Sequence, residues 1–155
     1  MPVHSVQHNY FNDVRQTGII HTMSDIHWLK KYEIGHKRID FEHQIFVDLI
    51  SKIDDAVKLE KDNIYIKGLL KELHAYTTFH FISEENIMYS INYPEYETHK
   101  ELHYKLLDTY NQKSLEISLK TLDINDFLIF LKDWFVNHTL NEDKKIAQYI
   151  EGKDV

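Results

Sequence analysis

The sequence predicts an all-α fold, an antiparallel up-and-down bundle of four helices. Apolar residues recur at the spacing of an amphipathic helix in four successive stretches of the 155-residue chain. Only four glycines and two prolines occur, which is fewer than a fold of short strands and tight turns requires. The stretches are joined by short connections, and short connections place consecutive helices side by side in opposite directions.

The first helix is expected at about residues 40–59 and the second at about 64–89. Between them Asp62 and Asn63 form a suitable helix cap. The apolar stripe of the first helix consists of Ile39, Phe46, Ile50, Ile53 and Val57. The stripe of the second consists of Ile66, Leu69, Leu73, Tyr76 and Ile87, and His80 and Glu84 interrupt it.

The third helix is expected at about residues 95–119 and the fourth at about 124–149. Pro94 separates the third from the second, because it disfavours a helical Tyr93 and suits a first helical turn. Asp123 and Asp126 supply the acidic groups that a helix start favours. The third stripe is Tyr96, His99, His103, Leu106, Tyr110 and Ile117, and the fourth is Phe127, Leu131, Trp134, His138, Ile146 and Ile150.

The chain ends are expected to lie outside the bundle. Residues 1–23 show no helical period and are interpreted as an N-terminal extension, either an ordered arm or a segment that precedes an alternative start at Met23. The bundle is assigned to residues 24–150 and a short C-terminal tail to residues 151–155.

Composition argues against several classes of protein. The formal net charge is −7 and no dense run of lysine and arginine occurs, so no nucleic-acid partner is expected. Cysteine is absent, which excludes disulfides, thiolate zinc sites and iron–sulfur ligation. No stretch reaches the roughly 18 apolar residues of a membrane span, and no signal peptide is recognisable. A cytoplasmic protein without a membrane partner is therefore expected.

Eleven histidines are an unusual number for this length, and five of them fall on buried stripes. His80 and Glu84 are one helical turn apart, so both side chains can reach one centre. His99 and His103 have the same spacing, while His43 and His138 interrupt the stripes of the first and fourth helices. A single such histidine is more often an ordinary core residue, but five on four helices indicate a metal site. A cation would also offset the cost of burying the Glu84 carboxylate.

The fourth helix supplies a second acid. Asp143 follows His138 by five residues, a spacing that separates two side chains by about 140° on a regular α-helix. Either the helix widens locally or the two side chains approach one centre from different sides. Glu142 lies closer to the stripe and is the rival candidate.

Together these residues resemble the bacteriohemerythrins. The resemblance covers about residues 27–147 and rests on His43, the motif H-F-x-x-E-E-x-x-M from His80, Tyr93-Pro94, the two histidines of the third helix, and H-x-x-x-x-D from His138. It implies a non-haem centre of two iron ions (Fe²⁺/Fe³⁺) with an oxo or hydroxo bridge. The implied ligands are His99, His103 and His138 on one iron, His43 and His80 on the other, and Glu84 and Asp143 as bridges.

Two positions depart from the pattern of these proteins. Glu42 stands where a glutamine is common, and Thr139 stands where an isoleucine is usual. All presumed ligands are present. Since ligand histidines depend on a partner for their second nitrogen, Glu42 is expected to change the affinity for dioxygen.

The resemblance implies reversible dioxygen binding, as in a carrier, a storage protein or a delivery protein, and no enzymatic activity. Five imidazoles against two carboxylates form a ligand set unlike that of carboxylate-rich di-iron enzymes. The alternatives are a di-iron enzyme that handles oxygen, peroxide or nitric oxide, and an oxygen-sensing module. Seven converging ligands exceed the four of a zinc site. The oligomeric state is left open, and no role is assigned to the other histidines, His4, His8, His21, His27, His36 and His74.

Overall fold

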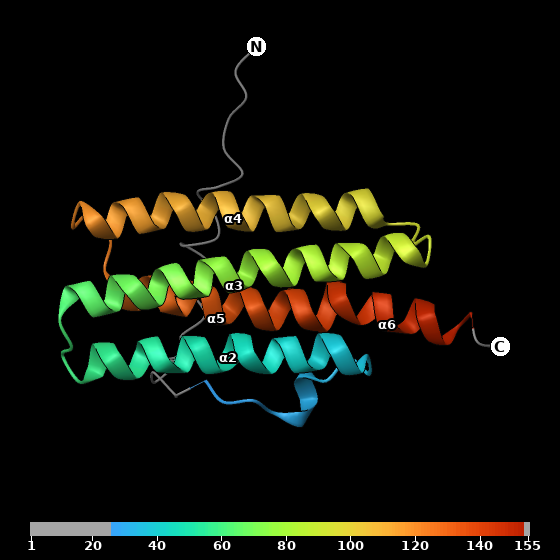
Figure 1. The fold of residues 1–155 in the computed structure, drawn as a ribbon, viewed down its shortest axis with the longest axis horizontal. Helices are drawn as coiled ribbons and strands as arrows, with labels where there is room; N and C mark the ends of the chain where they lie inside the picture. The colour runs from blue at the N-terminus through green and yellow to red at the C-terminus, as the bar shows by residue number, and fades with distance from the viewer. Residues whose placement is uncertain (1–25, 154–155) are drawn as a thin grey trace, which may run out of the picture.

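The computed structural model describes residues 26–153, and within them the chain is all-α, as the sequence predicts. The predicted extension at residues 1–23 lies outside the described residues. In chain order the elements are the 3-10 helix η1 (Lys30–Tyr32), the α-helices α2 (Lys37–Lys58), α3 (Asn63–Ser90), α4 (Tyr96–Ser118) and α5 (Ile124–His138), the π-helix η2 (Thr139–Asp143) and the α-helix α6 (Lys144–Glu151). Figure 1 shows α5, η2 and α6 as one continuous rod, so the bundle has four rods.

Neighbouring rods run in opposite directions, as expected from their short connections (Figure 1). Helix α2 contacts α3 and α5, and α3 contacts α4. The second, third and fourth rods begin and end within two residues of the predicted bounds. Helix α2 begins at Lys37 instead of about 40, because the ring of His36 accepts a hydrogen bond from Ile39 N and caps the helix. The last rod continues to Glu151, two residues beyond the predicted end of the fourth helix.

Gly35 precedes α2 with a φ of 98°, a conformation that side-chain-bearing residues rarely adopt. The Asp40 carboxylate fixes this segment, since its oxygens accept hydrogen bonds from Ile34 N at 2.7 Å and Gly35 N at 3.2 Å. Gly68 differs, because it lies exposed inside α3 and an added Cβ would meet no atom within 4 Å. Replacing these two glycines with alanine should therefore change the free energy of unfolding in opposite directions.

Gly35→Ala is expected to lower the free energy of unfolding by about 1–2 kcal/mol, because alanine would keep an unfavourable φ. Gly68→Ala is expected to raise it by about 0.5–1 kcal/mol, because alanine favours the helix. Urea denaturation of both variants measures the two changes. Equal destabilisation by both substitutions would contradict this account of Gly35.

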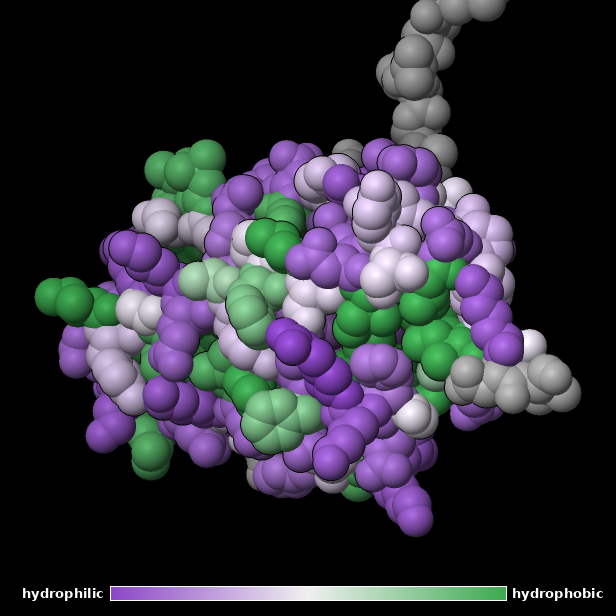
Figure 2. Space-filling view, turned by 45° about the vertical axis from the view of Figure 1, so that its right-hand side comes forward, coloured by the Kyte–Doolittle hydropathy of each residue, from purple (hydrophilic) through white to green (hydrophobic). Residues whose placement is uncertain are grey.

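The buried stripes form apolar regions on either side of a polar layer. The larger region includes Phe46, Val47, Ile50, Leu73, Tyr110, Phe127, Leu131 and Phe135. Two smaller clusters, Ile34 with Ile39 and Ala147, and Met88 with Tyr93 and Ile146, lie towards the other end. The five predicted histidines fall between these regions along their rods. On the face that Figure 2 shows, hydrophobic residues appear in separate places among hydrophilic ones, as expected for amphipathic helices.

Within residues 26–153, none of the helices combines the length and the apolar character that crossing a membrane demands.

Candidate metal centre

All seven side chains predicted from the sequence lie together in the polar layer of the bundle. They form two groups whose donor atoms lie within 4.8 Å of one another. One group consists of Glu84, His99, His103, His138 and Asp143, and the other of His43, His80 and Asp143. Every member is buried, with at most 7% of its surface exposed. The division matches the two sets of histidines that the resemblance implies.

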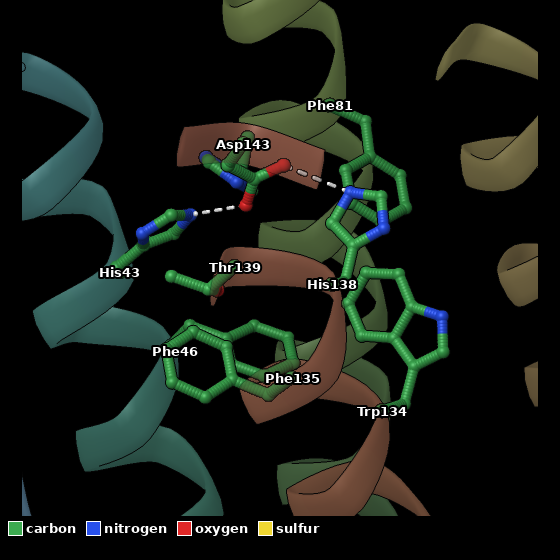
Figure 3. Close-up of a pocket in the computed structure, with 9 residues that line it drawn as sticks. His43, Phe46, Phe81, Trp134, Phe135, His138, Thr139 and Asp143 are labelled. Atoms are coloured by element: carbon green, nitrogen blue, oxygen red, sulfur yellow. Dashed lines mark ion pairs between the residues drawn. The ribbon is translucent and has the colours of Figure 1, made fainter. Parts of the chain in front are cut away.

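Asp143 lies between the two groups. Its Oδ1 is 2.9 Å from His138 Nε2 and 3.3 Å from His99 Nε2, whereas its Oδ2 is 3.2 Å from His43 Nε2. Figure 3 shows the same carboxylate facing His43 on one side and His138 on the other. One carboxylate therefore reaches both groups, which is the position that a bridging ligand requires.

Glu84 occupies a comparable position on α3. Its Oε2 is 3.6 Å from His80 Nε2 and 3.5 Å from His103 Nε2, so it too faces histidines of both groups. The residue has no exposed surface. A carboxylate buried to this degree is costly unless cations or donors offset its charge.

The π-helix η2 explains how Asp143 reaches the site. A π-helix pairs residues five apart, and His138 and Asp143 have this spacing. Both side chains therefore point inward from one rod. Of the two arrangements that the sequence leaves open, the structure has the local widening. Glu142 is partly exposed and pairs instead with Lys145 at 2.8 Å, so it does not join the cluster.

The converging atoms pass a direct test of whether they fit metal ions. Both oxygens of Glu84 and of Asp143, and Nε2 of three histidines, are buried without a hydrogen-bond partner among the described residues. Those histidines are His99, His103 and His138. Each such atom costs about 1–3 kcal/mol if nothing satisfies it. Nitrogen and oxygen atoms 2.9–3.9 Å apart that form no hydrogen bonds are arranged to share a cation.

Two further carboxylates orient the histidines, and the sequence indicates such a role for Glu42 but not for Glu85. Glu42 Oε2 lies 2.9 Å from His80 Nδ1, and Glu85 Oε1 lies 3.1 Å from His103 Nδ1. Each contact crosses from one helix to another and leaves the Nε2 of its histidine facing the cluster. Partners of this kind fix the ring orientation of metal-ligating histidines. In the sequence, the pair of adjacent glutamates in the H-F-x-x-E-E motif is the feature that could have indicated this role of Glu85.

Glu42 acts through His80 on α3, although it precedes His43 in the sequence. Burial would raise the pKa of Glu42, but hydrogen bonds from His80, Arg38 and Ser83 outweigh it and lower the pKa. Arg38 Nε and Ser83 Oγ both donate to Oε1 at 2.8 Å. The carboxylate is thus held ionised, and it favours an His80 that carries its proton on Nδ1.

Aromatic rings surround the cluster. Phe81 stacks on His103 with ring centres 3.8 Å apart, and Trp134 stacks on His138 at 4.4 Å. A cavity of about 10 Å³ lies against the group that contains His43 and His80. That volume is close to the least that a single water molecule requires. The nine lining residues are His43, Phe46, His80, Phe81, Trp134, Phe135, His138, Thr139 and Asp143.

The charges in the metal-free cluster shift several pKa values. Burial alone would raise the pKa of Asp143, but the surrounding His138, His43 and His99 hold it well below its usual range. Burial lowers the pKa of His103, yet the Glu84 carboxylate 3.5 Å from its Nε2 and the Glu85 carboxylate at its Nδ1 raise it to about 9. His103 of the metal-free protein is therefore protonated at neutral pH.

Addition of Fe²⁺ to the metal-free protein at pH 7 without air is expected to release a proton. The reason is that His103 must lose its proton before its nitrogen can bind a metal. Because its pKa is about 9, the release should disappear well above that pH. Calorimetric titration in two buffers of different ionisation enthalpy measures the protons released, and buffer-independent heats at pH 7 would contradict the prediction.

The comparisons with known proteins agree in pointing to one family. The family described as "Hemerythrin HHE cation binding domain" matches residues 35–150. A bacteriohemerythrin of Clostridium acetobutylicum is 29% identical over 130 residues, which cover 76% of this chain and 95% of that protein. A hemerythrin-like protein of Naegleria gruberi is 29% identical over 122 residues, covering 79% and 91%. A crystal structure of a hemerythrin mutant has a TM-score of 0.65 and 27% identity, covering 73% of this chain and 86% of that one.

Proposed function

Since the chain belongs to the hemerythrin family, whose domains hold a di-iron centre and bind oxygen, we propose that it binds dioxygen reversibly, as a carrier or store. His99, His103 and His138 would hold one iron, and His43 and His80 the other. Glu84 and Asp143 would bridge the two. Bound iron supplies the electrons that dioxygen binding requires, and the protein supplies the surroundings.

The position of the cavity carries the proposal. It lies against His43 and His80, the group with fewer candidate ligands, so a small molecule in the cavity faces the less crowded part of the cluster. Its volume of about 10 Å³ is close to the least that one water molecule requires, so it admits only a very small ligand and leaves no room for an organic substrate. This supports a binding protein over an enzyme that acts on larger molecules.

The aromatic lining protects what the cavity holds. Phe46 and Phe135 are stacked with ring centres 5.2 Å apart, and both are 2% exposed. Phe81 is equally buried and Trp134 covers His138. A dry lining of this kind excludes bulk water and slows side reactions of a reactive ligand. Such protection favours release of dioxygen unchanged.

The division of the chain is also part of the proposal. We assign the dioxygen-binding unit to residues 24–150, and the family match over residues 35–150 supports one continuous domain. The net charge of −7 supports a role without a nucleic-acid partner.

The test is a cycle of reduction and oxygenation on the purified protein. After reduction without air, metal analysis should give two irons per chain. Admission of oxygen should produce a ligand-to-iron charge-transfer absorption that disappears when oxygen is removed and returns on a second exposure. Steady consumption of a reductant with oxygen, peroxide or nitric oxide would instead identify a di-iron enzyme.

A further inference from the structure

The small cavity contains one neutral hydroxyl. Of its nine lining residues, the other eight are aromatic side chains or members of the metal cluster, and only Thr139 carries a hydroxyl. Thr139 is the first residue of the π-helix η2, between His138 and the turn that presents Asp143. It is 1% exposed, so its side chain meets the cavity and the core instead of solvent.

Figure 3 shows where this side chain lies. Thr139 reaches into the space bounded by His43, Asp143 and the stacked rings of Phe46 and Phe135. Trp134 is the other lining residue with a neutral polar atom, and its indole nitrogen lies on the side of the ring away from Thr139. Thr139 is thus the lining residue that brings a neutral hydroxyl to this space.

A hydroxyl in this position distinguishes between ligands by their polarity. It can donate one hydrogen bond and accept others, and such bonds strengthen in surroundings of low dielectric constant. Water and small anions accept a hydrogen bond from it readily, whereas free dioxygen is apolar. A lining made of aromatic rings alone would offer no such bond.

We propose that the Thr139 hydroxyl hydrogen-bonds the small ligand in this cavity and so favours polar ligands, water and small anions, over apolar ones. Thr139 is then a specificity-determining residue. The inference rests on the proposed function, since it assumes that the cavity is the ligand site of the iron pair. The Thr139 hydroxyl would then determine how well polar ligands compete with dioxygen for the cavity.

The experiment uses azide as the polar probe on the iron-loaded, oxidised protein. Thr139→Val removes the hydroxyl and keeps the shape, whereas Thr139→Ser keeps the hydroxyl. Thr77→Val is the matched control, because Thr77 is equally buried but its hydroxyl donates to Leu73 O within α3, outside the cavity. The absorption of the azide complex gives the affinity of each variant.

Loss of the hydroxyl in Thr139→Val should weaken azide binding by about threefold to tenfold. Thr139→Ser and Thr77→Val should stay within about twofold of the parent protein. The azide vibration should shift in D₂O for the parent and not for Thr139→Val, a signature that a purely structural role would not produce. If Thr139→Val does not fold, Thr139→Ala against Thr139→Ser makes the same comparison.

Unchanged azide affinity in the hydroxyl-free variant, or a D₂O shift that persists in it, would overturn the role of Thr139. With reversible oxygenation of the parent protein, that result would leave the proposed function intact. If instead the hydroxyl-free variant weakens azide binding while the parent protein does not bind dioxygen reversibly, the role of Thr139 holds and the proposed function fails.

Discussion

The Asp143→Asn variant is expected to fold as a helical bundle but to bind fewer than two irons per chain. Asp143 is within 3.3 Å of histidines in both groups, so both metal positions lose the same negative oxygen donor. Loss of a direct ligand should weaken metal binding by more than the about 10- to 100-fold that an orienting partner contributes. Metal analysis after dialysis against a competing chelator measures the loss.

Glu142→Gln is the matched control for this variant. It removes a carboxylate from the neighbouring residue, whose side chain points outward to Lys145. Two irons per chain should remain. Circular dichroism should show the same helix content in both variants, which separates loss of metal from loss of fold. Metal loss in Glu142→Gln with retention in Asp143→Asn would show that the wrong acid has been assigned.

Removal of iron from the intact protein is expected to lower its melting temperature strongly. The cluster buries two carboxylates whose four oxygens lack hydrogen-bond partners among the described residues, and metal ions offset that cost. Free metal at a thousand times its dissociation constant stabilises a protein by about 4 kcal/mol. For a chain of this length that corresponds to a decrease of about 8–16 °C on metal removal.

Calorimetry of the iron-loaded and chelator-treated protein measures this difference. The same treatment of Asp143→Asn should produce a smaller change, because that variant holds less metal and buries one charge fewer. An unchanged melting temperature after confirmed loss of both irons would mean that the buried acids are satisfied in some other way.

Much of the fold and the site could be predicted from the sequence because both depend on local spacing. The apolar stripes located all four rods, and histidines and acids on those stripes located the seven clustered side chains. Helix α2 begins before the predicted start, because its cap is a histidine ring and the segment before it is held by Asp40, neither of which is a common signal for a helix start. Contacts between side chains of different rods could not be predicted in this way.

The orienting roles of Glu42 and Glu85 depend on which helices are neighbours and on how each is rotated about its axis. A stripe defines the inward face of a helix but not the partner that a flanking side chain meets. Glu42 precedes His43 in the chain, yet its carboxylate contacts His80 of α3. For the same reason the cavity could not be predicted from the sequence, since it arises where side chains from separate rods fail to fill a space.

The widened turn also sets the phase of everything that follows it. Along a regular helix, the inward positions after His138 would be 142, 145 and 149, which are occupied by Glu142, Lys145 and Tyr149. The extra residue advances that face by one, to Asp143 and Ile146, which are buried, and to Ile150, which packs against the cluster of Met88, Tyr93 and Ile146. Deleting one residue between 139 and 142 would therefore remove the need for the widening, because Asp143 would then follow His138 by the four residues of a regular helical turn. If the turn instead became regular with all its residues present, Glu142 and Lys145 would face the apolar clusters and Ile146 would face outward, so the inward face of the last rod depends on the π-helix as much as on residue identity.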